Sequence, residues 1–275
     1  DILNNSFGIL CDNHHHEVAT AGQCEIDIKY DMMTNSADGA QSYKYVVRNI
    51  AQKFGKVATM MPKPISMDSG SGMHTNVSLW KNDVNAFYDK DEDLELSQIG
   101  RYFCGGIMSH AKALTAITNP TTNSYHRLVP GYEAPVYIAW AERNRSASVR
   151  IPLYKPGKEV ATRMELRFPD PTCNPYLAFS VMLSAGLDGL TNKTAIPEEM
   201  TMDLYRLSNS DRKKLNIEAL PHDLFEAVEV AESSEFLKEA LGEDVHGKLI
   251  ETKHSEVDKF RLHVSDKDLK EHLIL

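Results

Sequence analysis

The chain has 275 residues, of which 42% are hydrophobic and 25% charged, and this ordinary globular composition supports a buried core. At roughly 150 residues per domain, the length fits one large domain or two small ones. Its 39 acidic residues outnumber the 30 lysines and arginines, and the formal charge of −9 disfavours nucleic acid and anionic membranes as partners. No apolar run approaches the roughly 18 residues of a membrane span. The sequence therefore predicts a soluble protein with no nucleic-acid and no membrane partner.

The four cysteines, Cys11, Cys24, Cys104 and Cys173, have no C-x-x-C spacing. This scatter indicates neither a disulfide framework nor a zinc knuckle, so a reducing, cytoplasmic location is expected. The chain begins at Asp1 with a histidine-rich segment close behind, a pattern that indicates a fragment or a processed chain.

Hydrophobic periodicity predicts the elements of the first third. Polar and apolar residues alternate over 24–30, which predicts a strand with Glu25 and Asp27 on its wet face. Apolar residues recur at spacings of three and four over 37–54, which predicts an amphipathic helix that ends at Gly55. Further expected elements are strands at 60–66 and 73–80 and a hairpin turn at 81–83.

For the rest of the chain the sequence predicts a long helix followed by strands and more helices. Residues 97–117 predict a mostly apolar helix with Ser97 as N-cap, ended by Asn119 and Pro120. Downstream we expect a loop-rich segment at 121–135, strands at 148–154 and 163–168, a buried helix at 176–189 and a charged helical part at 196–275. Because strands and helices do not alternate strictly, an α+β layout with antiparallel strands fits better than a doubly wound parallel sheet.

The sharpest local feature is His14-His15-His16-Glu17, followed eight residues later by Glu25 at the start of a strand. Carboxylates and imidazoles without cysteine favour a hard divalent cation such as magnesium or manganese. A solvated loop, or a run of histidines like a purification tag, is the alternative.

Period-two spacing also groups polar side chains on two later strands. Arg163, Glu165 and Arg167 share one face, while Met164 and Leu166 point into the core. The alternative for this face is an exposed ladder of ion pairs, which is common. A neighbouring strand presents His74, Asn76 and Ser78 to one side.

Four arginines, Arg127, Arg143, Arg145 and Arg150, lie in a short loop-rich stretch and indicate an anionic ligand, the alternative being a surface charge cluster. Together with the acids and the histidine they favour metal-assisted phosphoryl transfer over a hydrolase triad. No Walker A loop, G-x-G-x-x-G motif or nucleophile elbow is present in the sequence.

Long ordered motifs then point to one family. They are HHHEVATAGQ at 14–23, MPKP at 61–64, GSGMH at 70–74, NPTTNSY at 119–125, RLVPGYEAP at 127–135, NRS at 144–146 and RFPD at 167–170. Over essentially its whole length the chain resembles the catalytic domain of class I glutamine synthetase, and the segment at 74–78 is similar to the archaeal and Gram-positive subgroup. The resemblance implies that 1–275 is one catalytic domain, an α+β fold with a curved antiparallel sheet flanked by helices, and that the family's N-terminal β-grasp domain is absent.

The resemblance also implies an activity, the synthesis of glutamine from L-glutamate, ammonium and ATP through γ-glutamyl phosphate. Two or three magnesium or manganese ions would serve each site. Carried across by motif, Glu17 and Glu25 would hold one ion, and His74 and Glu165 a second that bridges the ATP phosphates. Such ions would offset charge on the transferring phosphoryl group.

Substrate contacts are implied in the same way. Arg127 and Arg167 would bind glutamate, with Ser69 and Gly70 against its amino-acid end. Ser69 stands where many members have asparagine, so its contact would run through the backbone. Arg145 and Arg150 would contact ATP or the transferring phosphate, Asp12, Asn76 and Ser78 the nucleotide, and His15 the phosphoryl group. Glu133 would sit on a flap that excludes water and completes the ammonium site.

The family's shared active sites imply further expectations. Because a neighbouring N-terminal domain completes each site in the family, the isolated chain is expected to be inactive or nearly so. A full-length protein would form a dodecamer of two hexameric rings, with the C-terminal 269–275 segment docking on the opposite ring. The alternatives are a γ-glutamyl ligase for an amine or polyamine, and a non-catalytic structural or regulatory subunit.

Overall fold

A four-stranded mixed sheet forms the centre of the structure, a computed structural model that describes residues 1–152, 154 and 157–273. Its strands run in the order β3, β8, β7, β6; the β3–β8 and β8–β7 pairs are antiparallel and the β7–β6 pair is parallel. The strands are β3 (Thr75–Val77), β6 (Tyr137–Ala141), β7 (Ala147–Arg150) and β8 (Met164–Leu166). The α+β class is confirmed, whereas the expectation of a wholly antiparallel sheet is wrong for β6 and β7.

The sequence of β6 gives no period-two signal because this strand is covered on both faces. Tyr137, Ala139 and Trp140 are all buried, so apolar residues follow one another without alternation. The outer edge of β6 is covered too, since the Ile138 amide donates to the carbonyl of Glu218. A continuous apolar run carries no information on strand direction, which is why the parallel pair was missed.

Two long helices pack closely above this sheet. They are α3 (Gln98–Thr118) and α5 (Pro175–Asn192), and Ser97 caps α3 by accepting the Gly100 amide, as predicted. A Cβ at Gly106 would lie 2.1 Å from the Ala185 carbonyl oxygen, so only glycine permits this approach. The core between the helices and the sheet includes Phe103, Ile107, Leu114, Met164, Leu166 and Phe168.

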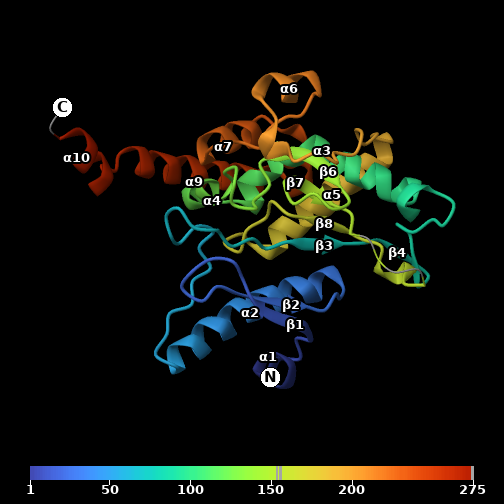
Figure 1. Ribbon diagram of the computed structural model, residues 1–275, viewed down its shortest axis with the longest axis horizontal. Coiled ribbons are helices and arrows are strands. Elements are labelled where there is room, and N and C mark those ends of the chain that lie inside the picture. Colours follow the sequence, from blue (N-terminus) through green and yellow to red (C-terminus); the bar gives the residue numbers. More distant parts are fainter. Residues whose placement is uncertain (153, 155–156, 274–275) are drawn as a thin grey trace.

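The N-terminal elements form a unit of their own, drawn in blue below β3 in Figure 1. They are α1 (Ile2–Phe7), β1 (Cys11–His16), β2 (Cys24–Ile28) and α2 (Met33–Lys53). β1 and β2 pair as an antiparallel hairpin, and Leu3, Ile9 and Val46 make a small core beside it. β1 was not predicted because its polar sequence has no alternation, while the predicted strand and helix that follow are confirmed.

Two predicted segments differ in the structure. The expected strand at 60–66 is a loop, because Pro62 and Pro64 lack the amide that a sheet ladder needs. The loop-rich segment at 121–135 contains the short helix α4 (Thr122–Arg127), started by a capping box between Thr121 and Ser124.

The hairpin turn predicted at 81–83 is confirmed between β4 (Trp80–Lys81) and β5 (Val84–Asn85), with Asn82 and Asp83 both at positive φ. The predicted strand at 148–154 ends at Arg150, and residue 153 lies outside the described residues. Single turns of 3₁₀ helix lie at η1 (Asp93–Glu95), η2 (Glu159–Ala161) and η3 (Leu204–Arg206).

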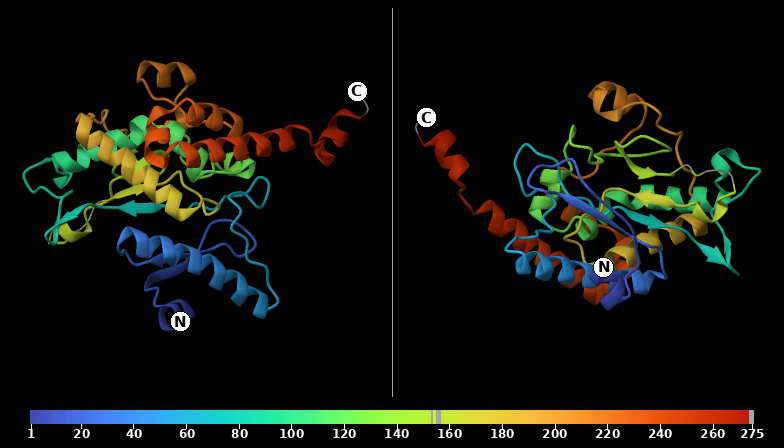
Figure 2. Two further views of the ribbon diagram at one scale, coloured as in Figure 1. Left: turned by 180° about the vertical axis from the view of Figure 1, so that it is seen from behind. Right: turned by 60° about the horizontal axis from the view of Figure 1, so that its bottom comes forward.

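The remainder of the chain is helical, as expected for 196–275, although residues 274 and 275 are outside the described part. Its helices are α6 (Asn209–Lys214), α7 (Leu224–Glu232), α8 (Glu235–Leu241), α9 (Glu243–Arg261) and α10 (Asp266–His272). The end of α9 and all of α10 extend away from the body as an arm (Figure 2). Leu262, Val264 and Leu273 on this arm are exposed.

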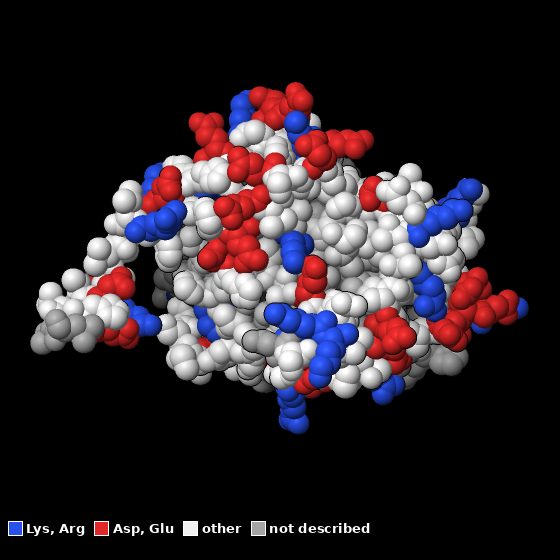
Figure 3. Space-filling model, turned by 90° about the horizontal axis from the view of Figure 1, so that it is seen from above, with Lys and Arg blue, Asp and Glu red and all other residues white. Residues whose placement is uncertain are grey.

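Two properties of the surface bear on partners. On the face shown in Figure 3, acidic and basic side chains are interspersed rather than gathered into one basic area. Of the helices in the described residues, none combines the length and apolarity that crossing a membrane requires.

Candidate active site

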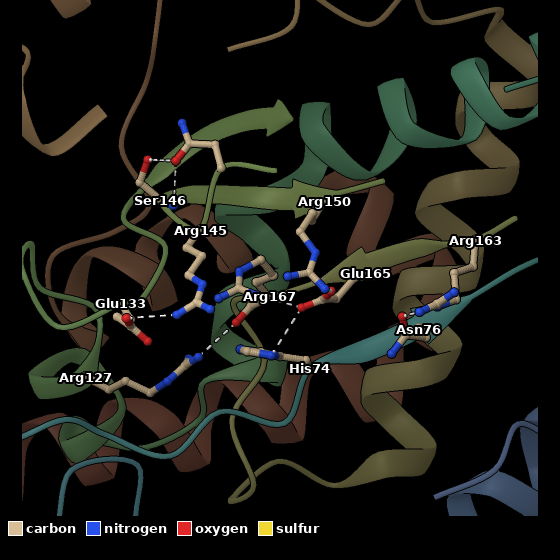
Figure 4. A network of polar contacts seen from close by, with 11 residues as sticks. His74, Asn76, Arg127, Glu133, Arg145, Ser146, Arg150, Arg163, Glu165 and Arg167 are labelled. Carbon is tan, nitrogen blue, oxygen red and sulfur yellow. Dashed lines mark hydrogen bonds and ion pairs between the residues drawn. The ribbon is translucent and has the colours of Figure 1, made fainter. Parts of the chain in front are cut away.

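A buried carboxylate, Glu165, is the centre of a polar network on the sheet (Figure 4). Its Oε1 lies 2.6 Å from Arg167 Nη1 and 3.3 Å from His74 Nδ1, and its Oε2 lies 2.5 Å from Arg150 Nη2. The alternation in β8 sends the neighbouring Met164 and Leu166 into the core, as predicted. Because Glu165 and Arg167 are only 4% and 5% exposed, the reading of this face as an exposed ladder of ion pairs is wrong.

Arg127 adds a second buried guanidinium beside this network. It donates 2.8 Å to the Phe168 carbonyl and 2.9 Å to the Arg167 carbonyl. Burial, together with the charge of Arg167, lowers its pKa to about 10, so it still carries its charge at neutral pH. A Cβ at Gly72 would lie 2.5 Å from Arg127 Nη2, which explains the glycine in the loop that crosses this side chain.

The network carries more positive charge than Glu165 can balance. Arg127 and Arg167 are buried and Arg150 is half-buried, and their three positive charges face two carboxylates, Glu165 and the buried Asp170, whose charge acts on Arg127. Among the described residues, the Nε atoms of Arg150 and Arg167 are buried with no hydrogen-bond partner. Unbalanced buried cations favour an anionic ligand, since an oxyanion supplies both charge and acceptors.

His74 is neutral in this setting. Burial and the charges of Arg167, Arg127 and Arg150 all lower its pKa well below the ordinary histidine value. A neutral imidazole has a lone pair for a metal ion. The Glu165 oxygens, in contrast, are occupied by guanidinium groups, so a cation held by His74 and Glu165 requires Arg150 or Arg167 to give way.

Glu133 and Arg145 face each other at the mouth of the network. Arg145 Nη1 lies 3.0 Å from Glu133 Oε1, and both side chains are exposed. Glu133 has a left-handed backbone at φ 58°, an uncommon conformation for a residue with a Cβ. This backbone turns the carboxylate toward Arg145 and the two buried arginines (Figure 4).

The predicted divalent-cation ligands gather on the β1–β2 hairpin. The register places His15 opposite Glu25, and ligand atoms of His15, Glu17 and Glu25 all lie within 4.8 Å of one another. Partial burial, a hydrogen bond that protonated Glu25 donates to Glu17, and the charge of Asp27 raise the pKa of Glu25 to about 7. Two crowded carboxylates that share a proton are a donor set that fits Mg²⁺ or Mn²⁺.

This pKa predicts how metal affinity depends on pH. Below pH 7 a proton neutralises Glu25, so the affinity for Mn²⁺ should fall about tenfold for each pH unit below 7 and level off above it. Titration of free Mn²⁺ by electron paramagnetic resonance at pH 6, 7 and 8 measures this. Glu25→Gln should bind weakly at all three values, whereas Asp83→Asn, in the exposed β4–β5 turn, should match the wild type. A Mn²⁺ affinity that is constant from pH 6 to 8 would contradict a cation site at Glu25.

Two loop contacts tie this hairpin to the network. Gln23 Nε2 donates to the Gly70 carbonyl and to Ser71 Oγ, 3.0 Å each, and Thr20 binds the carboxylate of Asp68. Ser69 and Gly70 therefore lie between the cation cluster and Arg127.

The predicted nucleotide contacts are less closely grouped. Asn76 accepts 2.9 Å from Arg163 Nε, and Ser78 Oγ accepts 2.9 Å from Trp80 Nε1. Asp12 is exposed on β1.

A pair of aromatic rings beside Ser78 was missed from the sequence. Tyr30 and Trp80 are parallel to within 3°, with centroids 6.4 Å apart, and both are exposed. Parallel aromatic rings at this centroid distance form an offset stack, and because both side chains are exposed the pair remains open to a further flat ring. Tyr30 follows β2 and Trp80 begins β4, and neither position gives a sequence signal of the pairing.

The site as a whole defines a class of protein. Carboxylates and a histidine that suit a divalent cation, an excess of arginine over carboxylate charge and an exposed aromatic pair suit a metal-dependent enzyme that acts on anionic, phosphorylated substrates.

The chain belongs to the glutamine synthetase catalytic domain family, which matches residues 2–272. It is 49% identical over 268 residues to the glutamine synthetase of Thermotoga maritima, covering 98% of this chain and 60% of that one. It is 48% identical over 270 residues to that of Sulfolobus acidocaldarius, covering 97% and 57%. A solved GmaS–ADP complex superposes with a TM-score of 0.89 at 33% identity, covering 99% of this chain and 62% of that one.

These findings confirm the family resemblance and the catalytic-domain fold. The chain spans about three fifths of the length of the relatives that it matches.

Proposed function

We propose that residues 1–275 form the catalytic domain, with a helical part at 196–275, of a glutamate–ammonia ligase that makes L-glutamine, ADP and phosphate from L-glutamate, ammonium and ATP. The observation that carries this proposal is the excess of arginine over carboxylate charge around Glu165, next to a hard-cation cluster, in a member of this family. An anionic amino acid and an anionic nucleotide are the substrates that such a site attracts.

Glutamate binds to the buried arginines in this proposal. Arg127 and Arg167 hold its carboxylates through charge-assisted hydrogen bonds, and the backbone of Ser69 and Gly70 lies against its amino-acid end. Because the Arg127 guanidinium is fixed by two backbone carbonyls, it presents its charge in one direction without further ordering.

Phosphoryl transfer comes next. An oxygen of the γ-carboxylate attacks the γ-phosphorus of ATP, ADP leaves, and an acyl phosphate forms. Arg145 and Arg150 stabilise the charge on the transferring group, with His15 beside it. Glu17 and Glu25 would hold one Mg²⁺ or Mn²⁺ ion and His74 and Glu165 a second; when bound, these ions neutralise phosphate charge.

Amide formation completes the cycle at Glu133. Its carboxylate holds ammonium and accepts a proton, so that ammonia attacks the carbonyl carbon and phosphate leaves. The loop of Glu133 must exclude water during this step, because water also attacks an acyl phosphate.

The nucleotide base is assigned to the exposed Tyr30–Trp80 ring pair, near Asp12, Asn76 and Ser78. The relative solved with ADP supports a nucleotide site in this fold. Trp80→Ala should weaken ADP binding, measured by calorimetry with Mn²⁺, by about 1–3 kcal/mol, the usual contribution of one aromatic ring stacked on a base. Trp80→Phe should recover most of the affinity, and Phe54→Ala, an exposed aromatic on another surface, should not change it. Unchanged ADP affinity in Trp80→Ala would exclude the aromatic pair as the base-binding position.

We also propose that these 275 residues, expressed alone, are inactive or nearly so. His15, Glu17 and Glu25 supply only part of the six positions of an octahedral cation, and the chain is three fifths as long as its relatives. Assembly as a dodecamer of two hexameric rings is part of this proposal, and the exposed apolar arm at α9–α10 suits docking on a second copy.

The experiment that tests the function is an assay of the native protein with ATP, Mg²⁺, glutamate and either ammonium or a series of amines and polyamines. Glutamine formation from ammonium supports the proposal. Products formed only from amines would make the protein a γ-glutamyl-amine ligase. Binding of Mn²⁺ and ADP without any product would indicate a non-catalytic subunit. A parallel assay of the 275-residue chain tests whether this chain by itself is inactive or nearly so.

A further inference from the structure

The loop at 130–134, which carries Glu133, is contacted on both sequence neighbours of Glu133 by residues that have no role so far. On one side the Lys63 ammonium lies 3.7 Å from the centre of the Tyr132 ring. On the other side the Tyr205 hydroxyl donates to the carbonyl of Ala134. Lys63 and Tyr205 are far apart in the sequence. The residues that they contact, Tyr132 and Ala134, directly precede and follow Glu133.

Both contacts come from anchored segments. The backbone of Lys63 is fixed by Asn123, which accepts from its amide at 2.9 Å and donates to its carbonyl at 3.0 Å. The Lys63 ammonium also donates to the Asp68 carbonyl, within the loop that Thr20 and Gln23 tie to the cation hairpin.

The segment of Tyr205 is held equally firmly. The Asn144 side chain donates to the carbonyls of Met200 and Met202, at 3.2 and 2.5 Å, and Ser146 Oγ accepts from the amide of the fully buried Leu204. Tyr205 is thus fastened to the same stretch that carries Arg145, the partner of Glu133.

The backbone between these anchors is strained at Glu133. Its φ of 58° is one that a residue with a Cβ rarely adopts, and its side chain is exposed, with its ion pair to Arg145 open to solvent. Exposed ion pairs contribute little, so the strained backbone needs support from elsewhere.

We propose that Lys63 and Tyr205 are positioning residues that clamp the 130–134 loop over the arginine pocket and so keep water from the activated glutamate. Lys63 acts through a cation–π contact with Tyr132, and Tyr205 acts through the Ala134 carbonyl. The role in water exclusion rests on the proposed function, whereas the clamp itself is a property of the fold.

Hydrogen exchange of the native protein without ligands tests the clamp. In Tyr205→Phe and in Tyr132→Leu, the amides of Glu133 and Ala134 should exchange roughly fivefold faster, the population change expected from losing one such contact. Tyr132→Phe keeps the ring and should exchange like the wild type. Tyr176→Phe, which removes a hydroxyl bound to Asp38 elsewhere, is the matched control. Exchange in Tyr205→Phe and Tyr132→Leu that equals this control would overturn the clamp.

A second readout separates positioning from general structure. With ammonium and glutamate present, the ratio of ADP released to glutamine formed should rise severalfold in Tyr205→Phe and Tyr132→Leu, because the open loop admits water to the acyl phosphate. Faster exchange with an unchanged ratio would overturn the water-excluding role. If the wild type makes no glutamine, the proposed function fails while hydrogen exchange still decides the clamp.

Discussion

Glu165→Ala should lower the free energy of unfolding by about 3–5 kcal/mol, the largest stability effect expected for a single substitution in this site. The substitution removes the carboxylate that pairs with Arg150 and Arg167 and leaves these guanidinium groups facing each other at the edge of the core. Urea denaturation measures the loss directly. The free energy of unfolding should fall less in Glu165→Gln, because the amide oxygen of the glutamine still accepts one hydrogen bond.

Glu229→Ala is the control, an exposed carboxylate on α7 whose removal should change stability by at most about 0.5 kcal/mol. Adding phosphate or glutamate as a ligand should not lower the free energy of unfolding of either variant. If Glu165→Ala unfolds at the same urea concentration as Glu229→Ala, the buried network does not balance charge as described.

Glu133→Gln should reduce the rate of glutamine formation by about 10²–10⁴-fold, the usual contribution of a positioned proton acceptor. Because Glu133 is exposed and its ion pair with Arg145 is open to solvent, the free energy of unfolding should change little. The ratio of ADP to glutamine should also rise, since phosphoryl transfer precedes the step at Glu133. Steady-state assays of both products measure the two effects together.

The matched substitution is Glu229→Gln, which should leave both rates within about twofold of the wild type. An undiminished rate of glutamine formation in Glu133→Gln would remove Glu133 from the proton transfer. A fall in melting temperature equal to that of Glu165→Ala would instead make Glu133 a structural residue.

Local periodicity predicted the elements whose two faces differ. The alternation at 163–168 placed Glu165 and Arg167 on one face of a strand, and the spacing at 97–117 placed α3 with its cap at Ser97. Periodicity could not tell that the polar face of β8 is buried, because burial depends on what the rest of the chain lays over it. The same limit hid β6, whose faces are both apolar.

The candidate site, too, could be predicted from the sequence only in part. His15, Glu17 and Glu25 were grouped from their residue types, and the cross-strand pairing of His15 with Glu25 supplies the reason that they meet. Tyr30 and Trp80 were not foreseen, since neither lies in a motif and the pairing of Tyr30 with Trp80 of β4 arises from tertiary structure alone. Long motifs thus supplied the family, whereas the clamp on Glu133 and the aromatic pair could be found only in the structure.

The most direct test of the central claim follows oxygen from glutamate to phosphate. The native protein is given ATP, Mn²⁺, ammonium and L-glutamate labelled with ¹⁸O in its γ-carboxylate, and the phosphate released is analysed by mass spectrometry. If the site activates glutamate as γ-glutamyl phosphate, each glutamine formed is accompanied by one phosphate that carries a single ¹⁸O. Glutamine formed together with unlabelled phosphate would contradict the account.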